Sequence, residues 1–493
     1  MLPTADMSIL IVVSLYLLGM LGAGLAFRRH NNSVGEYYLG SRRLPYWVIA
    51  FSMNATGESA WLLLGLSGMA YVVGIHAMWI VLGETLGVAL SWRLLARRLN
   101  RVGRRHDAIT LPDVLSAELK DRSHWLRGAS AIIILIMGSV YVAAQFLATG
   151  KAFETFMGWP YWIGVLLGGF VTIAYTSIGG FRAVAYTDMI QALFMLFAVL
   201  AVPIVGLVAL GGMSELIGLL STTDPALLDP MRASPTRLIS IIAIASALAV
   251  GLPFLGVPQL LVRYIAIRDE REIGKASCIS VIVIFLFGTG AVATGLVAKA
   301  LFPTLDDPET VMPLLSQSLF PPLLVGVLTV AVLSAVMSTV SSLLNLTSST
   351  VVRDLYQQCF RPDLRDDALG RIGVWVTLIV GLAGCLIALI QEGMIFNLVL
   401  FAWAGLGAAF GPVVLCMLWW PKTTRQGALA GIVAGFATTV VWMIEFKEKY
   451  YDLYEMIPGF LAGLIVTIIV SQSNKRKDNC AVGETDLKDS DLY

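Results

Sequence analysis

Residues 52–59 read Ser-Met-Asn-Ala-Thr-Gly-Glu-Ser and interrupt an apolar run that extends from Pro45 to about residue 72. The run is long enough to cross a membrane, but this stretch places polar side chains and a glycine near its middle. Hydrocarbon contains no water to satisfy the backbone groups that a break in a helix sets free, so such groups must face a cavity or a bound ion. The stretch therefore predicts a broken membrane helix that lines a binding site.

A second interruption follows five apolar runs later, where residues 251–258 read Gly-Leu-Pro-Phe-Leu-Gly-Val-Pro. Paired broken helices at corresponding positions are typical of secondary transporters that are built from inverted repeats. We therefore expect repeat one over about residues 45–210 and repeat two over about residues 237–419. Since Gly and Pro are also common in ordinary membrane helices, two unrelated kinks are the alternative.

Composition indicates that most of the chain lies in a membrane. Of its 493 residues, 57% are hydrophobic and only 14% are charged, whereas about one quarter of the residues in soluble domains are charged. Thirteen apolar runs predict thirteen membrane-spanning helices, at residues 7–27, 45–72, 75–96, 129–149, 159–178, 187–210, 237–260, 277–300, 322–350, 372–391, 395–419, 427–445 and 455–472. We expect an all-α polytopic membrane protein with a transmembrane domain over residues 1–472, in which 7–27, 427–445 and 455–472 lie outside the repeats.

The basic residues predict the orientation. With the N-terminus outside, the inner segments hold 28 of the 34 Lys and Arg residues, so the positive-inside rule places the C-terminus in the cytoplasm. The polar residues 473–493 predict a disordered cytoplasmic tail. Residues 7–27 are too long for a secretory signal, and we expect them to remain as the first helix.

Several function classes are excluded by what the sequence lacks. A net charge of +1 and four scattered histidines provide no basic stripe for nucleic acid and no metal cluster. No GxxxxGK[ST] phosphate loop occurs, and no nucleophile is accompanied by a base and an orienting group, so we expect no enzyme. An ion gradient must therefore drive transport, or the solute must move passively. A transporter-like solute sensor is the alternative from another class.

The ninth run carries oxygen donors that can face the first break. Ala335, Ser338 and Thr339 lie at i, i+3 and i+4 and therefore share one helical face. With the carbonyl groups of Ala55 and Glu58 they would form a five-oxygen site, and such hard donors suit a small alkali cation. Serines at this spacing also join neighbouring helices, which is the alternative interpretation.

Asp188 supplies a carboxylate at membrane depth in the sixth run, and Ser341 and Ser342 continue the hydroxyl face. Intramembrane carboxylates are usually functional, because burying one without a partner costs several kcal/mol. The sequence reveals no obvious basic partner for Asp188. We therefore expect it to bind an ion, and the alternative is a structural contact with helix backbone or a serine.

The same residues resemble the sodium/solute symporters, and within them the bacterial sodium/proline symporters. The similarity covers nearly the whole chain and is carried by residues 59–66 (SAWLLLGL), 175–181 (YTSIGGF) with 187–188 (TD), 335–339 (AVMST) and 402–415 (AWAGLGAAFGPVVL). The resemblance implies thirteen helices around a leucine-transporter-like five-plus-five inverted repeat in the bacterial cytoplasmic (inner) membrane. It implies Na+-coupled import of a small zwitterionic solute, proline or another amino acid, by alternating access.

The resemblance also implies roles for individual residues. It assigns a first Na+ to the carbonyl groups of Ala55, Glu58 and Ala335 and the hydroxyl groups of Ser338 and Thr339. It assigns a possible second Na+ to Asp188, Ser338, Ser341 and Ser342. It assigns the solute to Thr56, Ser59, Trp61, Tyr141, Gln145, Val250 and Phe254. Besides Na+, the solute and membrane lipid are the expected partners, and the oligomeric state is left open.

The sequence departs from the proline symporters near both sites. After the first break those proteins read Asp-Met-Ser-Gly-Trp, whereas residues 57–61 read Gly-Glu-Ser-Ala-Trp, which turns the carboxylate by about 100° on a helix. Val250 and Phe254 replace a substrate-facing Trp and Tyr, and Glu84 stands where those proteins are apolar. Glu58 and Glu84 could share a proton and couple transport to H+. Alternatively, they cap freed backbone groups or face an aqueous vestibule. The exact solute and the number of Na+ ions per cycle stay open.

Overall fold

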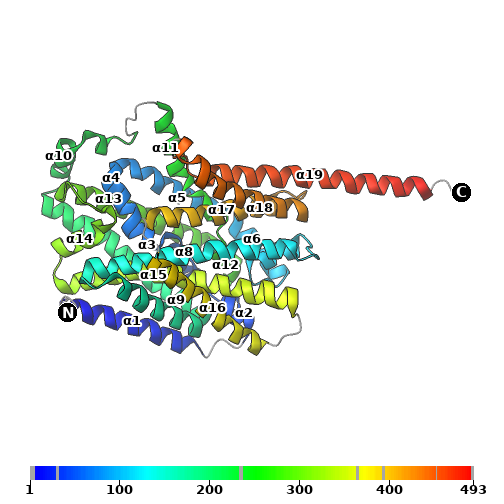
Figure 1. Cartoon of the computed structure of the whole chain (residues 1–493), viewed down its shortest axis with the longest axis horizontal. Coiled ribbons are helices and arrows are strands. Elements are labelled where there is room, and N and C mark those ends of the chain that lie inside the picture. Colours follow the sequence, from blue (N-terminus) through cyan, green and yellow to red (C-terminus); the bar gives the residue numbers. More distant parts are fainter. Residues whose placement is uncertain are drawn as a thin grey trace.

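The computed structural model describes residues 6–28, 33–231, 237–361, 366–390, 395–450 and 452–489. Within these ranges the chain is almost entirely helical, and its one extended pairing is a parallel bridge between Leu44 and Ile267. The helices form an elongated bundle (Figure 1). They are α1 (Met7–Phe27), α2 (Val34–Leu39), α3 (Tyr46–Ala60), α4 (Ser67–Val73), α5 (Met78–Ser91), α6 (Arg97–Arg105), α7 (Leu111–Glu118), α8 (Trp125–Met157), α9 (Tyr161–Leu210), α10 (Met213–Thr223), α11 (Arg237–Ala249), α12 (Pro258–Ala266), α13 (Ile273–Leu301), α14 (Val311–Leu319), α15 (Pro322–Ser349), α16 (Asp366–Ile390), α17 (Ile395–Trp419), α18 (Arg425–Val441) and α19 (Met456–Asp489).

Eleven helical segments of the described chain are long and apolar enough to cross a membrane, which confirms an all-helical chain with many membrane-length helices. Two of them, Tyr46–Arg105 with 60 residues and Tyr161–Leu210 with 50 residues, are too long for one crossing, since about 20 residues span the hydrocarbon. Each covers two predicted spans and is interrupted at a glycine with positive φ, Gly74 at 67° and Gly180 at 62°. Thirteen crossings and the five-plus-five repeat stay predictions.

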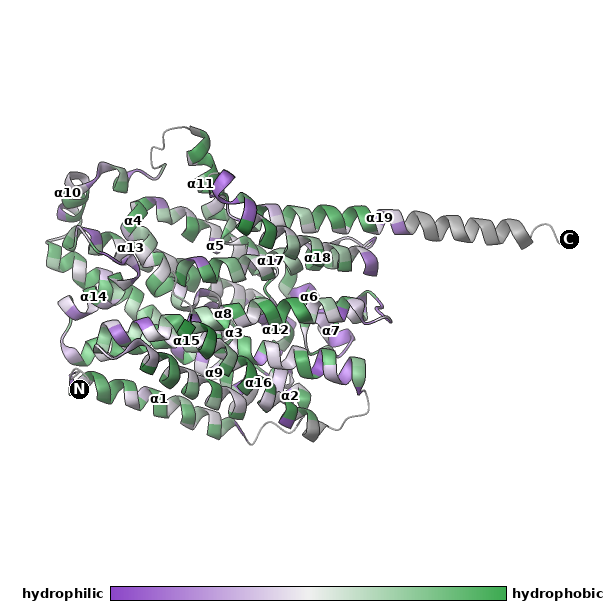
Figure 2. Cartoon of the chain, viewed as in Figure 1, coloured by the Kyte–Doolittle hydropathy of each residue, from purple (hydrophilic) through white to green (hydrophobic). Residues whose placement is uncertain are grey.

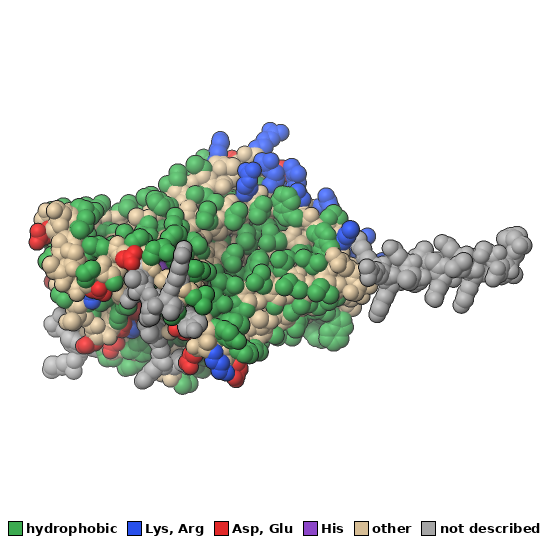
Figure 3. All heavy atoms as spheres, turned by 90° about the horizontal axis from the view of Figure 1, so that it is seen from above, with side chains coloured by type: hydrophobic (Ala, Val, Ile, Leu, Met, Phe, Trp, Pro, Cys, Tyr) green, Lys and Arg blue, Asp and Glu red, His purple; other side chains and the backbone are tan. Residues whose placement is uncertain are grey.

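α15 and α17 form the centre of the bundle. The apolar windows of both are 83% buried inside the protein, compared with 33% for α1 and 28% for α19. α15 packs against α1, α3, α8 and α9, whereas α18 and α19 pack mainly on each other and on α17. Figure 2 shows hydrophobic residues along most helices, and in Figure 3 hydrophobic side chains cover the middle of the visible face. This exterior is suited to lipid.

Glycines let the second break approach its neighbours closely. The break joins α11 to α12, and a Cβ on Gly251 would overlap the carbonyl group of Gly83 on α5. A Cβ on Gly256 would likewise overlap the backbone at Gly411 on α17. Only glycine permits such backbone contacts. Packing against the broken helix therefore explains part of the glycine-rich run at residues 402–415.

α19 extends beyond the bundle (Figure 1). The backbone is helical as far as Asp489, and residues 490–493 lie outside the described chain. The disordered cytoplasmic tail over residues 473–493 stays a prediction. Residues 473–489 contain no proline, and several of them have high helix propensity. This part of α19 is therefore a local continuation of a membrane-length helix.

Candidate functional site

The first break lies at the end of α3, where Ser59 has φ 55° and ψ −168°. This conformation is nearly confined to glycine, and a side chain there costs about 1–3 kcal/mol. Two backbone N–H groups after Ser59 have side-chain partners: Trp61 N donates to Ser59 Oγ at 3.1 Å, and Ala60 N donates to Gln145 Oε1 at 3.1 Å. These hydrogen bonds stabilise the strained segment and account for the positions of Ser59 and Gln145.

The carbonyl groups before the break face the hydroxyl groups of α15. Ser338 Oγ lies 3.1 Å from both Ala55 O and Ala335 O. Thr339 Oγ1 lies 3.2 Å from both Thr56 O and Ala335 O. All of these residues are buried. Three carbonyl oxygens and two hydroxyl oxygens from α3 and α15 therefore converge, and no nitrogen or sulfur atom of these side chains competes.

Four of the five predicted ligands of the first ion are thus close together. The Glu58 carbonyl accepts a hydrogen bond from Trp61 N, and the carbonyl of Thr56 joins the cluster. A carbonyl oxygen has two lone pairs, so Glu58 retains the capacity to bind an ion. An all-oxygen donor set of this kind suits a hard alkali cation. The two hydroxyl groups would turn their hydrogens away from the carbonyls when the ion enters.

Asp188 has a basic partner, contrary to the sequence analysis. Arg263 Nη2 lies 2.8 Å from Asp188 Oδ2, and the side chains are 1% and 0% exposed. The sequence analysis did not identify Arg263, which follows the predicted span at residues 237–260, as this partner. The second break changes the direction of the chain before α12. As a result, the side chain of Arg263 on α12 lies inside the bundle.

Three hydroxyl groups surround this ion pair. Ser52 Oγ donates to Asp188 Oδ2 at 2.8 Å, while Arg263 Nη2 donates to Thr56 Oγ1 at 2.7 Å and to Ser342 Oγ at 2.6 Å. The resulting network joins α3, α9, α12 and α15, which come from both predicted repeats. We call these five residues the arginine network.

Only part of the predicted second ion site is assembled. Ser342 Oγ lies 3.4 Å from Asp188 Oδ2, but Ser341 Oγ donates to the Ser338 carbonyl at 3.1 Å instead. Asp188 Oδ1 is buried and has no hydrogen-bond partner among the described residues. One carboxylate oxygen therefore serves Arg263, and the other is available for a further ligand.

Five aromatic side chains, which we call the aromatic cluster, gather near the first break: Trp61, Tyr141, Phe254, Phe396 and Trp403. Trp61 stacks on Phe396 with ring centroids 6.0 Å apart. Trp403 contacts Phe254 and Tyr141 edge to face, at 5.1 Å and 6.4 Å. The cluster therefore joins the two broken helices to α8 and α17.

Of the seven residues of the predicted solute site, Trp61, Tyr141 and Phe254 belong to the aromatic cluster. Ser59 and Gln145 bind the backbone at the first break, and the Val250 carbonyl accepts a hydrogen bond from Trp403 Nε1 at 3.1 Å. Thr56 differs, because its hydroxyl belongs to the arginine network. The sequence analysis did not identify Phe396 or Trp403. Trp403 lies within the quoted run at residues 402–415, and its position in a glycine-rich helix was the available signal.

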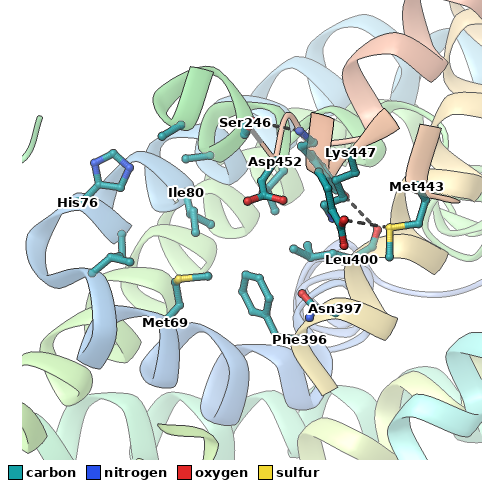
Figure 4. Close-up of a pocket in the computed structure, with 17 residues that line it drawn as sticks. Met69, His76, Ile80, Ser246, Phe396, Asn397, Leu400, Met443, Lys447 and Asp452 are labelled. Carbon is teal, nitrogen blue, oxygen red and sulfur yellow. Dashed lines mark hydrogen bonds between the residues drawn. The ribbon is translucent and has the colours of Figure 1, made fainter. Parts of the chain in front are cut away.

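A pocket of about 550 Å³ adjoins the aromatic cluster (Figure 4). Its lining includes Val250 and Phe396, and charged side chains such as Lys447 and Asp452 lie across the pocket from Phe396. The other lining residues come mainly from α4, α5, α11 and α17 and from the segment before α19. We call it the outer pocket, because the segments at its rim are those that the charge distribution predicts to lie outside.

The chain is similar to known sodium and proline transporters over most of its length. The model of the sodium:solute symporter family matches residues 37–435. The osmoregulated proline transporter OpuE of Bacillus subtilis is 36% identical over 95% of this chain and 96% of that protein. The sodium/proline symporters of Staphylococcus aureus and Salmonella typhimurium are 36% and 37% identical, over 97% and 94% of this chain and 94% and 93% of their own lengths.

Two solved structures share the fold. A Na+-coupled sialic acid symporter in a substrate-bound, outward-open state matches with a TM-score of 0.79 and 20% identity, over 95% of this chain and 98% of that chain. A nucleobase-cation-symport-1 family transporter in a closed conformation matches with a TM-score of 0.56 and 11% identity, over 90% and 96%.

The helical fold and the oxygen-lined break define an ion-coupled secondary transporter. The chain belongs to the sodium:solute symporter family, since the family model matches most of its length. It is a Na+-coupled solute symporter and an integral membrane protein.

Proposed function

We propose that this symporter imports proline together with Na+ across the bacterial cytoplasmic (inner) membrane. Relatives named for proline transport are 36–37% identical over nearly the whole chain, and Trp61 and Tyr141 of the predicted solute site are both present in the aromatic cluster. The proposal includes thirteen crossings, a five-plus-five inverted repeat, an outer N-terminus and a cytoplasmic C-terminus. The convergence of α15 hydroxyl groups on the carbonyl groups of the first break is the observation that carries it.

The strained segment at Ser59 provides the coupling in this proposal. Na+ would be held by the backbone immediately before Ser59, and the solute would contact Trp61 immediately after it. Both ligands would therefore favour the same backbone conformation, so each would raise the affinity for the other. Transfer of one Na+ down a potential of 100 mV releases about 2.3 kcal/mol. With the concentration gradient this supports roughly hundredfold accumulation, at about 1.4 kcal/mol per tenfold.

A second Na+ at Asp188 is part of the proposal in a revised form. The unpaired Asp188 Oδ1 supports an ion there. Because Arg263 occupies the other oxygen of this carboxylate, ion binding would depend on the position of the guanidinium group.

Coupling to H+ through Glu58 and Glu84 is a second candidate function. Both oxygens of Glu58 and one oxygen of Glu84 are buried without a hydrogen-bond partner among the described residues, which supports a site that takes up a proton. Uptake of radiolabelled amino acids into proteoliposomes distinguishes the two candidates. We expect proline to accumulate with an inward Na+ gradient and not with an H+ gradient alone. Accumulation driven by H+ in the absence of Na+ would replace the Na+ proposal.

Replacement of Trp61 or Tyr141 with alanine should weaken solute binding more than ion binding. We expect the half-saturating proline concentration to rise at least tenfold, because each ring offers an apolar face with a polar edge, while the half-saturating Na+ concentration changes less than threefold. Trp125→Ala is the control, since this tryptophan is 72% exposed on the hydrophobic exterior. Equal losses for both substrates would indicate a role in folding.

A further inference from the structure

Glu58 and Glu84 form a buried carboxyl pair that the Na+ site does not use. Glu58 is 1% exposed and Glu84 is 4% exposed. The two carboxyl groups lie close enough for the charge of one to affect the other. Among the described residues, both carboxyl oxygens of Glu58 and the Oε2 oxygen of Glu84 have no hydrogen-bond partner. Burial of two unpaired carboxylates is strongly unfavourable, so the pair requires a cationic partner or protons.

The pair lies where the two broken helices meet. Glu58 belongs to the first break itself. Glu84 is on α5 next to Gly83, whose carbonyl group lies against Gly251 in the second break. The Tyr141 hydroxyl group lies close to both carboxyl groups and to the Ser59 side chain. The carboxyl pair is therefore next to the aromatic cluster.

Two buried hydrogen-bond donors near the pair also have no partner among the described residues: Gln145 Nε2 and Trp61 Nε1. The Gln145 amide is held in place, because its Oε1 accepts a hydrogen bond from Ala60 N at 3.1 Å. The same hydrogen bond places Gln145 beside the residue that precedes Trp61. Unpaired carboxyl oxygens and unpaired N–H groups thus lie next to each other in one site. A ligand with one positive and one negative group would satisfy both.

We propose that Glu58 and Glu84 bind the positively charged nitrogen of a zwitterionic solute, and that Gln145 and Trp61 donate hydrogen bonds to its carboxylate. This inference rests on the proposed symport of an amino acid. The unpaired buried oxygens of these carboxyl groups are hydrogen-bond acceptors, and an ammonium group supplies both the donors and the opposite charge. The aromatic faces of the cluster add attraction for a cation.

The outer pocket provides a route to this site. Tyr454 lines the pocket and lies close to Glu84, and Phe396 belongs to both the pocket and the aromatic cluster. In Figure 4, Lys447 and Asp452 stand across the pocket from Phe396. The pocket therefore presents both signs of charge to a solute that approaches the carboxyl pair.

A pair of isosteric probes tests the inference. L-proline carries a ring ammonium group, whereas tetrahydrofuran-2-carboxylate has a neutral ether oxygen at the same position. Affinities are measured as ligand-dependent thermal stabilisation of the purified full-length protein in detergent with saturating Na+, which does not require transport. We expect the wild type to prefer proline at least a hundredfold. In Glu58→Gln and Glu84→Gln this preference should fall at least tenfold, through weaker proline binding alone.

Glu215→Gln is the matched control, because this carboxyl group is exposed on α10, and it should leave the preference unchanged. Equal loss of affinity for both probes in the Glu58 and Glu84 variants would overturn the inference in favour of a structural role. An unchanged preference would also overturn it. In that case, a tenfold shift of the half-saturating Na+ concentration in these variants would assign the pair to Na+ binding. Loss of proline-driven H+ uptake, measured with a pH-sensitive dye in proteoliposomes, would assign the pair to H+ transport.

Failure of the proposed function has a different signature. If the wild type binds proline with the expected preference but shows no Na+-driven uptake, the symport proposal fails and the inference stands. If the wild type is stabilised by neither probe, the proline proposal fails. The other amino acids of the uptake panel are then tested in the same way. If the protein binds none of them more tightly than an analogue without a charged nitrogen, the inference is overturned as well.

Discussion

Replacing Arg263 with alanine is expected to reduce Na+-driven proline uptake at least a hundredfold and to destabilise the protein. Asp188 would then be a buried carboxylate without its cation, since the two side chains are 0% and 1% exposed and only 2.8 Å apart. Breaking a buried ion pair by removing one partner costs about 3–5 kcal/mol, and about 1.4 kcal/mol corresponds to a tenfold change. Uptake into proteoliposomes and thermal unfolding of the purified protein measure the two effects.

The double variant Arg263→Ala/Asp188→Asn separates the ion pair from other effects. It removes both charges, so we expect it to be more stable than Arg263→Ala alone, with the non-additivity that residues in contact show. Arg101→Ala is the control, because its ion pair with Glu270 lies at the surface, where the Arg101 side chain is 60% exposed. Such surface pairs contribute about 0–1 kcal/mol. A double variant as unstable as Arg263→Ala would contradict a role for the pair.

The same residues test the second Na+ position. If Asp188 binds Na+ through its free oxygen, Asp188→Asn should lower the charge that moves with each proline or abolish coupling while proline still binds. Direct measurement of charge per solute is required, because a noncooperative second site leaves the Hill coefficient near one. One charge per proline in the wild type, with unaltered uptake in the Asn variant, would rule the second Na+ out.

Thr339→Ala is expected to raise the half-saturating Na+ concentration at least tenfold while the protein remains folded. Thr339 Oγ1 lies 3.2 Å from the carbonyl oxygens of Thr56 and Ala335, so its loss leaves a dehydrated cation without one ligand. Thr339→Ser retains the hydroxyl group and should keep the Na+ dependence within about threefold of the wild type. The measurement is initial uptake of proline as a function of Na+ concentration.

Thr329→Ala is the control for this variant. Thr329 is fully buried on the same helix, but among the described residues its hydroxyl group hydrogen-bonds only to the Val325 carbonyl of α15 itself. We expect its Na+ dependence to match that of the wild type. If Thr339→Ala also leaves the Na+ dependence unchanged, the ion does not bind between α3 and α15.

Local features of the site could be predicted from the sequence because they depend on spacing along one helix. Ala335, Ser338 and Thr339 share a face wherever α15 packs, and the polar stretch at residues 52–59 must be satisfied wherever α3 lies in the membrane. The oxygen donors suggested that these two elements face each other, the family resemblance implied the same, and the contact of Ser338 with Ala55 agrees with it.

Contacts between distant segments could not be predicted in the same way. Arg263 follows an apolar run and looks like an ordinary cytoplasmic arginine, yet it is buried against Asp188. The aromatic cluster likewise depends on Phe396 and Trp403, whose side chains meet those of Trp61 and Phe254 only after α17 packs against both breaks.

The sequence by itself thus determined the membrane environment, the two breaks and the hydroxyl face, since hydropathy and helical periodicity are properties of neighbouring residues. Only the tertiary structure decided which groups neutralise one another. Asp188 has a cation that lies far away in the sequence, whereas Glu58 and Glu84 are buried together without a hydrogen-bonded partner for most of their oxygens among the described residues. The physical reason is that the energy of a buried charge depends on the distance to its counter-charge in space, and backbone packing at the two breaks sets that distance.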